Sequence, residues 1–201
     1  ADDGPPKYER PPRGSIVDTY VQPEGRPYFG ETLLVHGSRL YAGAPMESYV
    51  PGSVTNGAVY EIDLDALAPM RRIPAPAPAG FFGSALAVAG NTLFVGAPSA
   101  PSLDLQLGSL HELDVATGAF LRTTGNPEPR QGRGYGRALA VGGGRLVVAA
   151  PLSPAEPALP NVLYVYDLAT RALERTIADP DGSSSGFGSG LLIVGDFLLA
   201  S

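Results

Sequence analysis

Three aspartates at matching places in the sequence are its clearest candidates for acid–base or metal chemistry. Asp63, Asp114 and Asp167 each end a short apolar run. Clustered carboxylates could hold a cation or serve as general acid and base. Their recurrence at one place in every repeat instead favours a structural role, in which each carboxylate accepts backbone N–H groups of a turn. We expect that structural role.

The other candidates for chemistry are two histidines and one acidic segment. His36 and His111 lack a second histidine at metal-ligand spacing and a nucleophile motif, so zinc hydrolysis and acyl transfer miss required parts. Segment 179–183, Asp-Pro-Asp-Gly-Ser, resembles part of a calcium loop, but Pro180 interrupts it and the distant Glu ligand is missing. The sequence therefore predicts no catalytic residue, no metal site and no cofactor.

Composition excludes several functional classes. The 201 residues include 26 Gly, 21 Pro and no Cys, which removes disulfide scaffolds, cysteine-ligated metals and thiol nucleophiles. A formal charge of −6 disfavours partners such as nucleic acid or anionic membrane, and no apolar stretch is long enough to insert as a transmembrane helix. The chain starts at Ala1 instead of Met, which fits a secreted protein that has lost its signal peptide and equally a chain that was trimmed; we favour export.

The glycines and prolines belong to a sequence repeat, and the strands of this repeat must position any functional site. An aromatic residue followed by Gly recurs at a spacing of about 53 residues. These pairs begin at Phe29, Phe82, Tyr135 and Phe187. A second motif, Gly-Ala-Pro or Ala-Ala-Pro, follows the first three pairs at 43–45, 96–98 and 149–151. Each repeat also shows alternating apolar residues and short Gly turns, which predict four short antiparallel strands.

Such units are typical of propeller blades, so we expect an all-β fold, a β-propeller with three full four-stranded blades plus an incomplete fourth. The full blades are expected at about 29–73, 82–124 and 135–177. Partial strands are expected at 16–21 and 187–201, within a propeller segment 15–201 that follows a Pro-rich lead at 1–14. The missing strands could come from a longer chain, from a second chain completing one ring, or from both termini forming one closing blade. We favour a piece of a larger propeller.

The phased Phe-Gly and Gly-Ala-Pro motifs resemble the FG-GAP repeat family of integrin α-chain heads and many bacterial surface or secreted proteins. This resemblance covers residues 15–201 and implies a propeller that acts in adhesion. Integrin-like copies carry a calcium loop between the first two strands of a blade. Here those turns are too short for a calcium cage, so the resemblance is to a short-turn variety without calcium ligands. The turns lie at Gly37, Gly90, Gly143 and Gly195. We also expect Gly83 to need a backbone conformation or a close approach that a β-branched residue cannot adopt.

Binding residues are expected on the long loops, which share one face of the propeller opposite the short turns. The candidates are Tyr49, Asp104, Gln106, Arg130, Arg133 and Glu156. The same residues could simply be solvated loop side chains. We expect a non-enzymatic scaffold that recognises protein or carbohydrate ligands, secreted or at a cell surface, with self-association as a further possibility. The alternatives are a glycan-cleaving propeller enzyme, which would need a convergent acid and base, and a purely structural module of a larger protein.

Overall fold

All regular elements in the described part of the chain are β-strands. The structure is a computed structural model that describes residues 28–47, 56–66, 68–76, 80–99, 108–128, 134–151, 160–182 and 186–201. The strands are β1 (Thr32–His36), β2 (Arg39–Ala44), β3 (Ala58–Asp63), β4 (Ala68–Pro74), β5 (Ala85–Ala89), β6 (Thr92–Ala97), β7 (Ser109–Asp114), β8 (Phe120–Gly125), β9 (Leu139–Gly142), β10 (Arg145–Ala150), β11 (Val162–Asp167), β12 (Leu173–Ala178), β13 (Leu191–Val194) and β14 (Phe197–Ala200). Over these residues no helix is long and apolar enough to cross a membrane.

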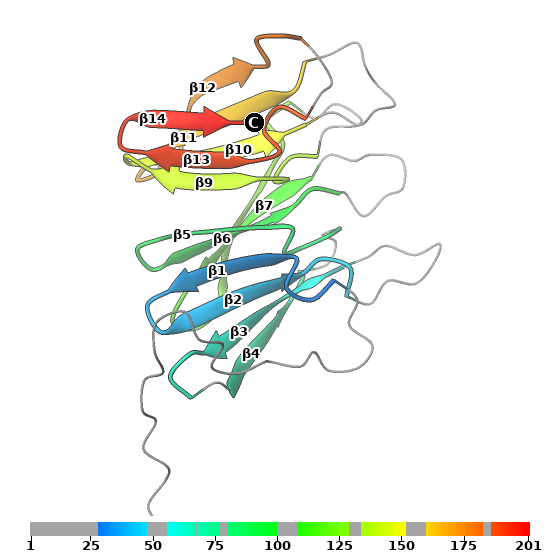
Figure 1. Cartoon of the computed structure of the whole chain (residues 1–201), viewed down its shortest axis with the longest axis vertical. Helices are drawn as coiled ribbons and strands as arrows, with labels where there is room; N and C mark the ends of the chain where they lie inside the picture. Colours follow the sequence, from blue (N-terminus) through cyan, green and yellow to red (C-terminus); the bar gives the residue numbers. More distant parts are fainter. Residues whose placement is uncertain are drawn as a thin grey trace, which may run out of the picture.

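The strands form three four-stranded antiparallel sheets and one hairpin. The sheets have the orders β1-β2-β3-β4, β5-β6-β7-β8 and β9-β10-β11-β12, and β13 pairs with β14. The first strands of successive sheets touch, β1 with β5, β5 with β9 and β9 with β13. The sheets therefore follow one another along a shared inner edge (Figure 1). The predicted β-propeller, with three full blades and an incomplete fourth, is confirmed. The lead at 1–14 and the strand expected at 16–21 lie outside the described residues.

The core lies between the sheets, and three junctions contain most of it. We call the contact of β1–β4 with β5–β8 the first junction, that of β5–β8 with β9–β12 the second, and that of β9–β12 with β13–β14 the third. Tyr41 and Val95 meet at the first junction, and Phe94 and Tyr164 at the second. Strand alternation gives each blade two apolar faces, so every full blade can bury one face on each neighbour.

The two halves of the sequence motif meet across the junctions, which explains why they keep one phase. A Cβ atom added to Gly43 would lie 2.1 Å from the Gly83 carbonyl oxygen, and one added to Gly96 would lie 1.9 Å from that of Gly136. Gly83 itself has a φ of 97°, and its added Cβ would lie 2.8 Å from the Ala58 carbonyl oxygen. The backbones approach too closely for side chains there, as expected for Gly83.

The two ends of the described row of blades expose apolar side chains more fully than their repeat equivalents. Leu33 and Val35 of β1 are 64% and 60% exposed. Leu199 of β14 is 57% exposed, whereas Phe94, at the same place in the second blade, is fully buried. An apolar blade face without a neighbouring blade remains in contact with water.

Candidate functional site

The six side chains that the sequence places on the long-loop face lie outside the described residues. They are Tyr49, Asp104, Gln106, Arg130, Arg133 and Glu156. Their role in binding stays a prediction. The description of a site below rests on the charged and polar groups of the described residues.

The three repeated aspartates have the structural role that the sequence predicts. Asp63 Oδ1 accepts the N–H groups of Asp65 and Ala66 at 2.8 and 3.0 Å. Asp114 and Asp167 likewise accept N–H and hydroxyl groups from the threonine three residues on, at 2.6 to 2.8 Å. These hydrogen bonds hold the pKa of all three carboxyls below the usual Asp value. Each Asp therefore fixes the turn between the third and fourth strands of its blade.

His111 is part of the packed frame of the second blade. Its ring is 2% exposed, and its two nitrogens lie 2.9 Å from Ser109 Oγ and 3.0 Å from Thr123 Oγ1. Burial lowers the pKa of His111 to about 4, so the ring is neutral near pH 7. It packs edge-on against the motif aromatic Phe82, with ring centroids 5.4 Å apart.

The equivalent residues of the other blades support this structural interpretation of His111. Tyr60 packs against Phe29 with centroids 5.2 Å apart, and Tyr164 packs against Tyr135 at 5.7 Å. In each blade, one aromatic ring of the third strand thus rests on the aromatic of the Phe-Gly or Tyr-Gly motif. His111 takes the place of a tyrosine in that pair.

The acidic segment that begins at Asp179 forms a turn which the second blade also contains. Asp179 Oδ1 accepts the Asp181 N–H at 3.0 Å, and Asn126 Oδ1 accepts the Glu128 N–H at 3.0 Å. Both are turns of an Asx residue followed by Pro, a local backbone device. Within the described ranges, no group of three or more His, Cys, Asp or Glu residues could hold a metal ion.

At the first junction, a buried glutamate is neutralised by two arginines of its own blade. Glu61 on β3 has a side chain that is 1% exposed. Arg71 on β4 donates from Nε to Glu61 Oε2 at 2.7 Å, and Arg39 Nη1 on β2 lies 2.8 Å from Glu61 Oε1. Both guanidinium groups also donate to the Val115 carbonyl oxygen of the next blade, at 3.1 and 2.8 Å. The ion pairs thus connect the two blades.

At the second junction, the next blade supplies one of the two arginines. Glu112 on β7 replaces Glu61, and Arg122 on β8 replaces Arg71, although its Nε lies 4.0 Å away. The closer partner is Arg171 in the turn after β11, whose Nε donates to Glu112 Oε2 at 2.8 Å. Its guanidinium also lies 5.0 Å from the centre of the Phe94 ring. Arg171 therefore does for the second junction what Arg39 does for the first.

At the third junction, the arginines remain but the glutamate is absent. Val165 on β11 stands where Glu61 and Glu112 stand, and Arg175 on β12 pairs with it in register. Arg145 on β10 takes the place of Arg39, and its Nε lies 2.8 Å from Glu174 Oε2 at the surface. In the described part of the chain, Arg175 has no ion-pair partner.

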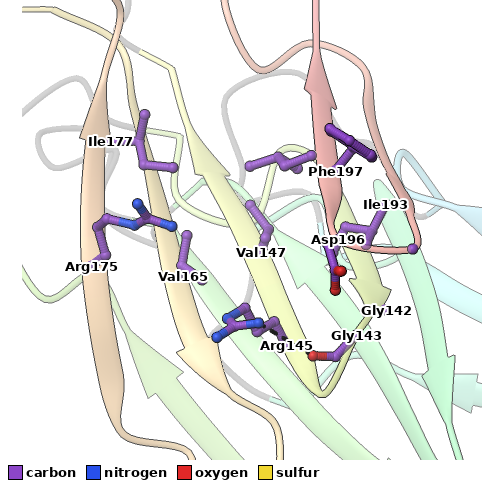
Figure 2. A pocket seen from close by; sticks show the side chains of 12 residues that line it. Gly142, Gly143, Arg145, Val147, Val165, Arg175, Ile177, Ile193, Asp196 and Phe197 are labelled. Carbon is purple, nitrogen blue, oxygen red and sulfur yellow. Dashed lines mark hydrogen bonds between the residues drawn. The ribbon is translucent and has the colours of Figure 1, made fainter.

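These two arginines line a pocket of about 200 Å³ between β9–β12 and the terminal hairpin. Figure 2 shows them on the sheet face that carries Val147 and Val165, with the hairpin opposite. The residues lining the pocket come from β9–β12 and from the hairpin. They are Gly142, Gly143, Arg145, Val147, Val165, Arg175, Ile177, Ile193, Gly195, Asp196, Phe197 and Leu198. The pocket thus combines an apolar floor with two cationic groups and one carboxylate, Asp196.

The pocket lies at a junction beside the short turns, whereas the sequence analysis looked to the long loops. Gly143 and Gly195, which line it, belong to the two-residue turns of the third blade and the hairpin. An alignment of the repeats does contain a signal for it. Val165 stands at the repeat position of Glu112, whereas the arginine that faces this position is kept as Arg175. The third blade therefore has the cation without the carboxylate.

Comparison with known proteins supports the fold but no specific activity. No protein-family model and no curated protein matches the sequence. The chain is similar to a solved europium-containing methanol dehydrogenase, with a TM-score of 0.52 and 19% identity over 76% of this chain. It spans about a quarter of the dehydrogenase, since the match covers 25% of that protein. A second similar structure is the WD40 domain of Neurospora crassa Pan2, with a TM-score of 0.48, 10% identity, and 74% and 35% of the two chains covered. At its identity, the likeness to the dehydrogenase concerns the propeller fold alone.

Proposed function

We propose that the chain is a non-enzymatic binding scaffold of the FG-GAP type that recognises a protein or glycan ligand at a cell surface or in the extracellular space. The observation that carries this proposal is that the charged groups of the first two junctions belong to the frame. They are buried in internal ion pairs, which leaves the loops of the blades to recognise a ligand. Rigid frames that present a few polar groups in a concave site are typical of ligand-binding proteins.

The roles of the conspicuous polar residues also favour binding over catalysis. His111 is a neutral ring in the core, and the three repeated aspartates fix turns. Glu61 and Glu112, the buried carboxylates of the first two junctions, are matched by arginines. These groups hold the frame together, which leaves the loops as the places for a ligand.

The contacts between motif residues support the FG-GAP resemblance, which implies adhesion. The Phe-Gly half of the motif in one blade packs on the Gly-Ala-Pro half of the blade before it, as Gly83 does on Gly43. A repeat built on such contacts can present ligand sites at its loops and junctions without changing its core.

A protein and glycan array tests the proposal. The 201-residue chain is compared with a variant whose loops 99–107 and 152–160 are replaced by Gly-Ser, and with Arg137→Gln as a control for a change outside these loops. We expect specific binding that is lost in the loop variant but kept in Arg137→Gln. If the chain is folded but binds no ligand on the array, the result would favour a structural module. Turnover of any polysaccharide would favour the enzyme.

A further inference from the structure

A small cavity lies at the second junction, between the two complete blades β5–β8 and β9–β12. Its volume is about 10 Å³, which is close to the smallest space that holds one water molecule. Polar residues from both blades line it. They are Glu112, Thr124, Tyr135, Tyr166 and Arg171. The cavity therefore brings carboxylate, hydroxyl and guanidinium groups together in the interior of a junction.

One carboxylate oxygen at this cavity has no direct hydrogen-bond partner in the described part of the chain. Arg171 Nε donates to Glu112 Oε2 at 2.8 Å, whereas Arg122 Nε lies 4.0 Å from Glu112 Oε1. A separation of 4.0 Å is too long for a direct hydrogen bond, but a water molecule can bridge it. The Glu112 side chain is only 7% exposed, so Oε1 needs a donor.

The first junction shows what normally fills this place. Arg39 Nη1 lies 2.8 Å from Glu61 Oε1, the oxygen that corresponds to Glu112 Oε1. Thr92 stands at the repeat position of Arg39 and supplies no guanidinium group. The second junction therefore lacks the donor that the first junction takes from its own blade.

A pair of tyrosines at the same cavity has a hydroxyl hydrogen to donate. Tyr135 donates to the Tyr166 hydroxyl at 2.9 Å, so the hydroxyl hydrogen of Tyr166 needs another acceptor. No residue of the described ranges accepts it. Burial raises the pKa of both tyrosines, and the positive charge of Arg122 acts against this rise. Arg122 is thus close to the two hydroxyl groups as well as to Glu112.

We infer that this cavity is a binding site for one ordered water molecule that links the second and third blades. The water accepts hydrogen bonds from the Tyr166 hydroxyl and from Arg122, and it donates to Glu112 Oε1 and to Thr124 Oγ1. These four bonds use every donor and acceptor of the water and complete those of two buried side chains. The site belongs to the frame, so it does not depend on the ligand-binding function proposed above.

Size and charge select water over an ion. A metal cation would be repelled by Arg122 and Arg171, and hard cations need more oxygen ligands than the cavity offers. An anion would face the carboxylate of Glu112. A neutral molecule that both donates and accepts hydrogen bonds fits this mixture of groups.

A high-resolution crystal structure of the 201-residue chain tests the inference. We expect a water peak within hydrogen-bonding distance of Glu112 Oε1 and the Tyr166 hydroxyl. Tyr166→Phe should weaken the peak, because the water loses a hydrogen-bond donor. Tyr41→Phe is the matched control, since it removes a buried hydroxyl at the first junction, and it should leave the peak unchanged.

Water-selective NMR spectra of the labelled chain provide a test in solution. We expect cross-peaks from water to the methyl groups of Leu110 and Leu146, which also line the cavity, with NOE and ROE of opposite sign, as for a water molecule that stays bound. Thr92→Arg should lose these cross-peaks, because its guanidinium group takes the place of the water as Arg39 does at the first junction. The variant keeps the Tyr166 hydroxyl, so a signal relayed by exchange of that hydrogen would persist.

Several outcomes would overturn the inference. A direct hydrogen bond from Tyr166 or Arg122 to Glu112 Oε1, with no peak between them, would show that the side chains satisfy one another. A peak with the scattering and contacts of an ion would reject water as the ligand. A peak that Tyr166→Phe leaves unchanged, or cross-peaks that persist in folded Thr92→Arg, would reject the hydrogen bonds assigned to the water. Should Thr92→Arg fail to fold, the crystal structure of the unaltered chain still decides.

Discussion

The second and third junctions use equivalent faces of successive blades, yet the second buries an ion pair and the third holds a larger pocket. At the second junction, Arg171 reaches across from the following blade to Glu112. At the third, the glutamate is replaced by Val165, and Arg175 faces the pocket. The two junctions also differ in the following blade, because the hairpin β13–β14 contains no turn after a third strand that could pack on this face as the turn of Arg171 does on Glu112. The frame and the candidate site are built from the same repeat position.

The largest expected effect comes from adding a side chain where the backbones of two neighbouring blades approach each other closely. Gly83→Val should lower the free energy of unfolding by at least about 3 kcal/mol, because Val at positive φ is strained and its Cβ would meet the Ala58 carbonyl group. Chemical denaturation followed by circular dichroism measures the change. Gly125→Val is the control, since Gly125 has open space and no positive φ. An unchanged midpoint for Gly83→Val would contradict the role of the motif contact.

A second prediction tests whether Arg171 replaces Arg39 in the ion pair. Arg171→Gly, which copies Gly118 of the second blade, should cost about 2 kcal/mol, because Glu112 stays buried with only the distant Arg122. Adding Thr92→Arg, which copies Arg39 of the first blade, should restore at least half of the loss. A double-mutant cycle measures this coupling. If the effects of Arg171→Gly and Thr92→Arg on the free energy of unfolding are additive, Arg171 and Arg39 do not have equivalent roles.

A third prediction places pH sensitivity in the frame and not in the pocket. The pKa of His111 is about 4 in the folded chain and about 6.5 when unfolded, so the unfolded state binds the proton more readily. Stability is complete above pH 6.5 and is lost as the pH falls toward 4, by about 2 kcal/mol between pH 7 and pH 5. The aspartates with lowered pKa act in the same direction, but below about pH 4.

Denaturation curves at pH 7 and pH 5 measure this loss, and His111→Tyr is the matched variant, because tyrosine occupies that place in the other two blades. The variant should lose most of the difference between pH 7 and pH 5. An equal pH dependence in both proteins would mean that other groups cause it.

The smallest expected effects come from exchanging the residues that distinguish the two junctions. Glu112→Val should cost about 1 kcal/mol, since Arg171 and Arg122 keep partial access to water. Val165→Glu should change stability by less than about 1 kcal/mol, because Arg175 stands in register to neutralise the new carboxylate. Thermal denaturation of both variants compares them. A loss of about 3 kcal/mol in Val165→Glu, as for a buried carboxylate without a partner, would show that Arg175 cannot reach it.

Local sequence was enough to predict the strands and the turn aspartates. Alternation of apolar residues and two-residue Gly turns depend on neighbours in sequence, so the strands of all three blades are found within a few residues of their expected places. Asp114 bonds to a threonine only three residues away, and such contacts are readable from the pattern. The long-loop binding residues have no pattern of this kind and stay predictions.

The repeat by itself determined that this chain forms β-propeller blades, because period, alternation and turn residues all agree on one fold. The tertiary structure alone decided which repeated charges are satisfied. Arg171 and Glu112 are far apart in sequence and meet only when two blades stack. The same stacking sets Arg175 beside Val165 at the edge of a pocket. Whether an arginine has a partner in the frame depends on the neighbouring blade, and local sequence does not contain that contact.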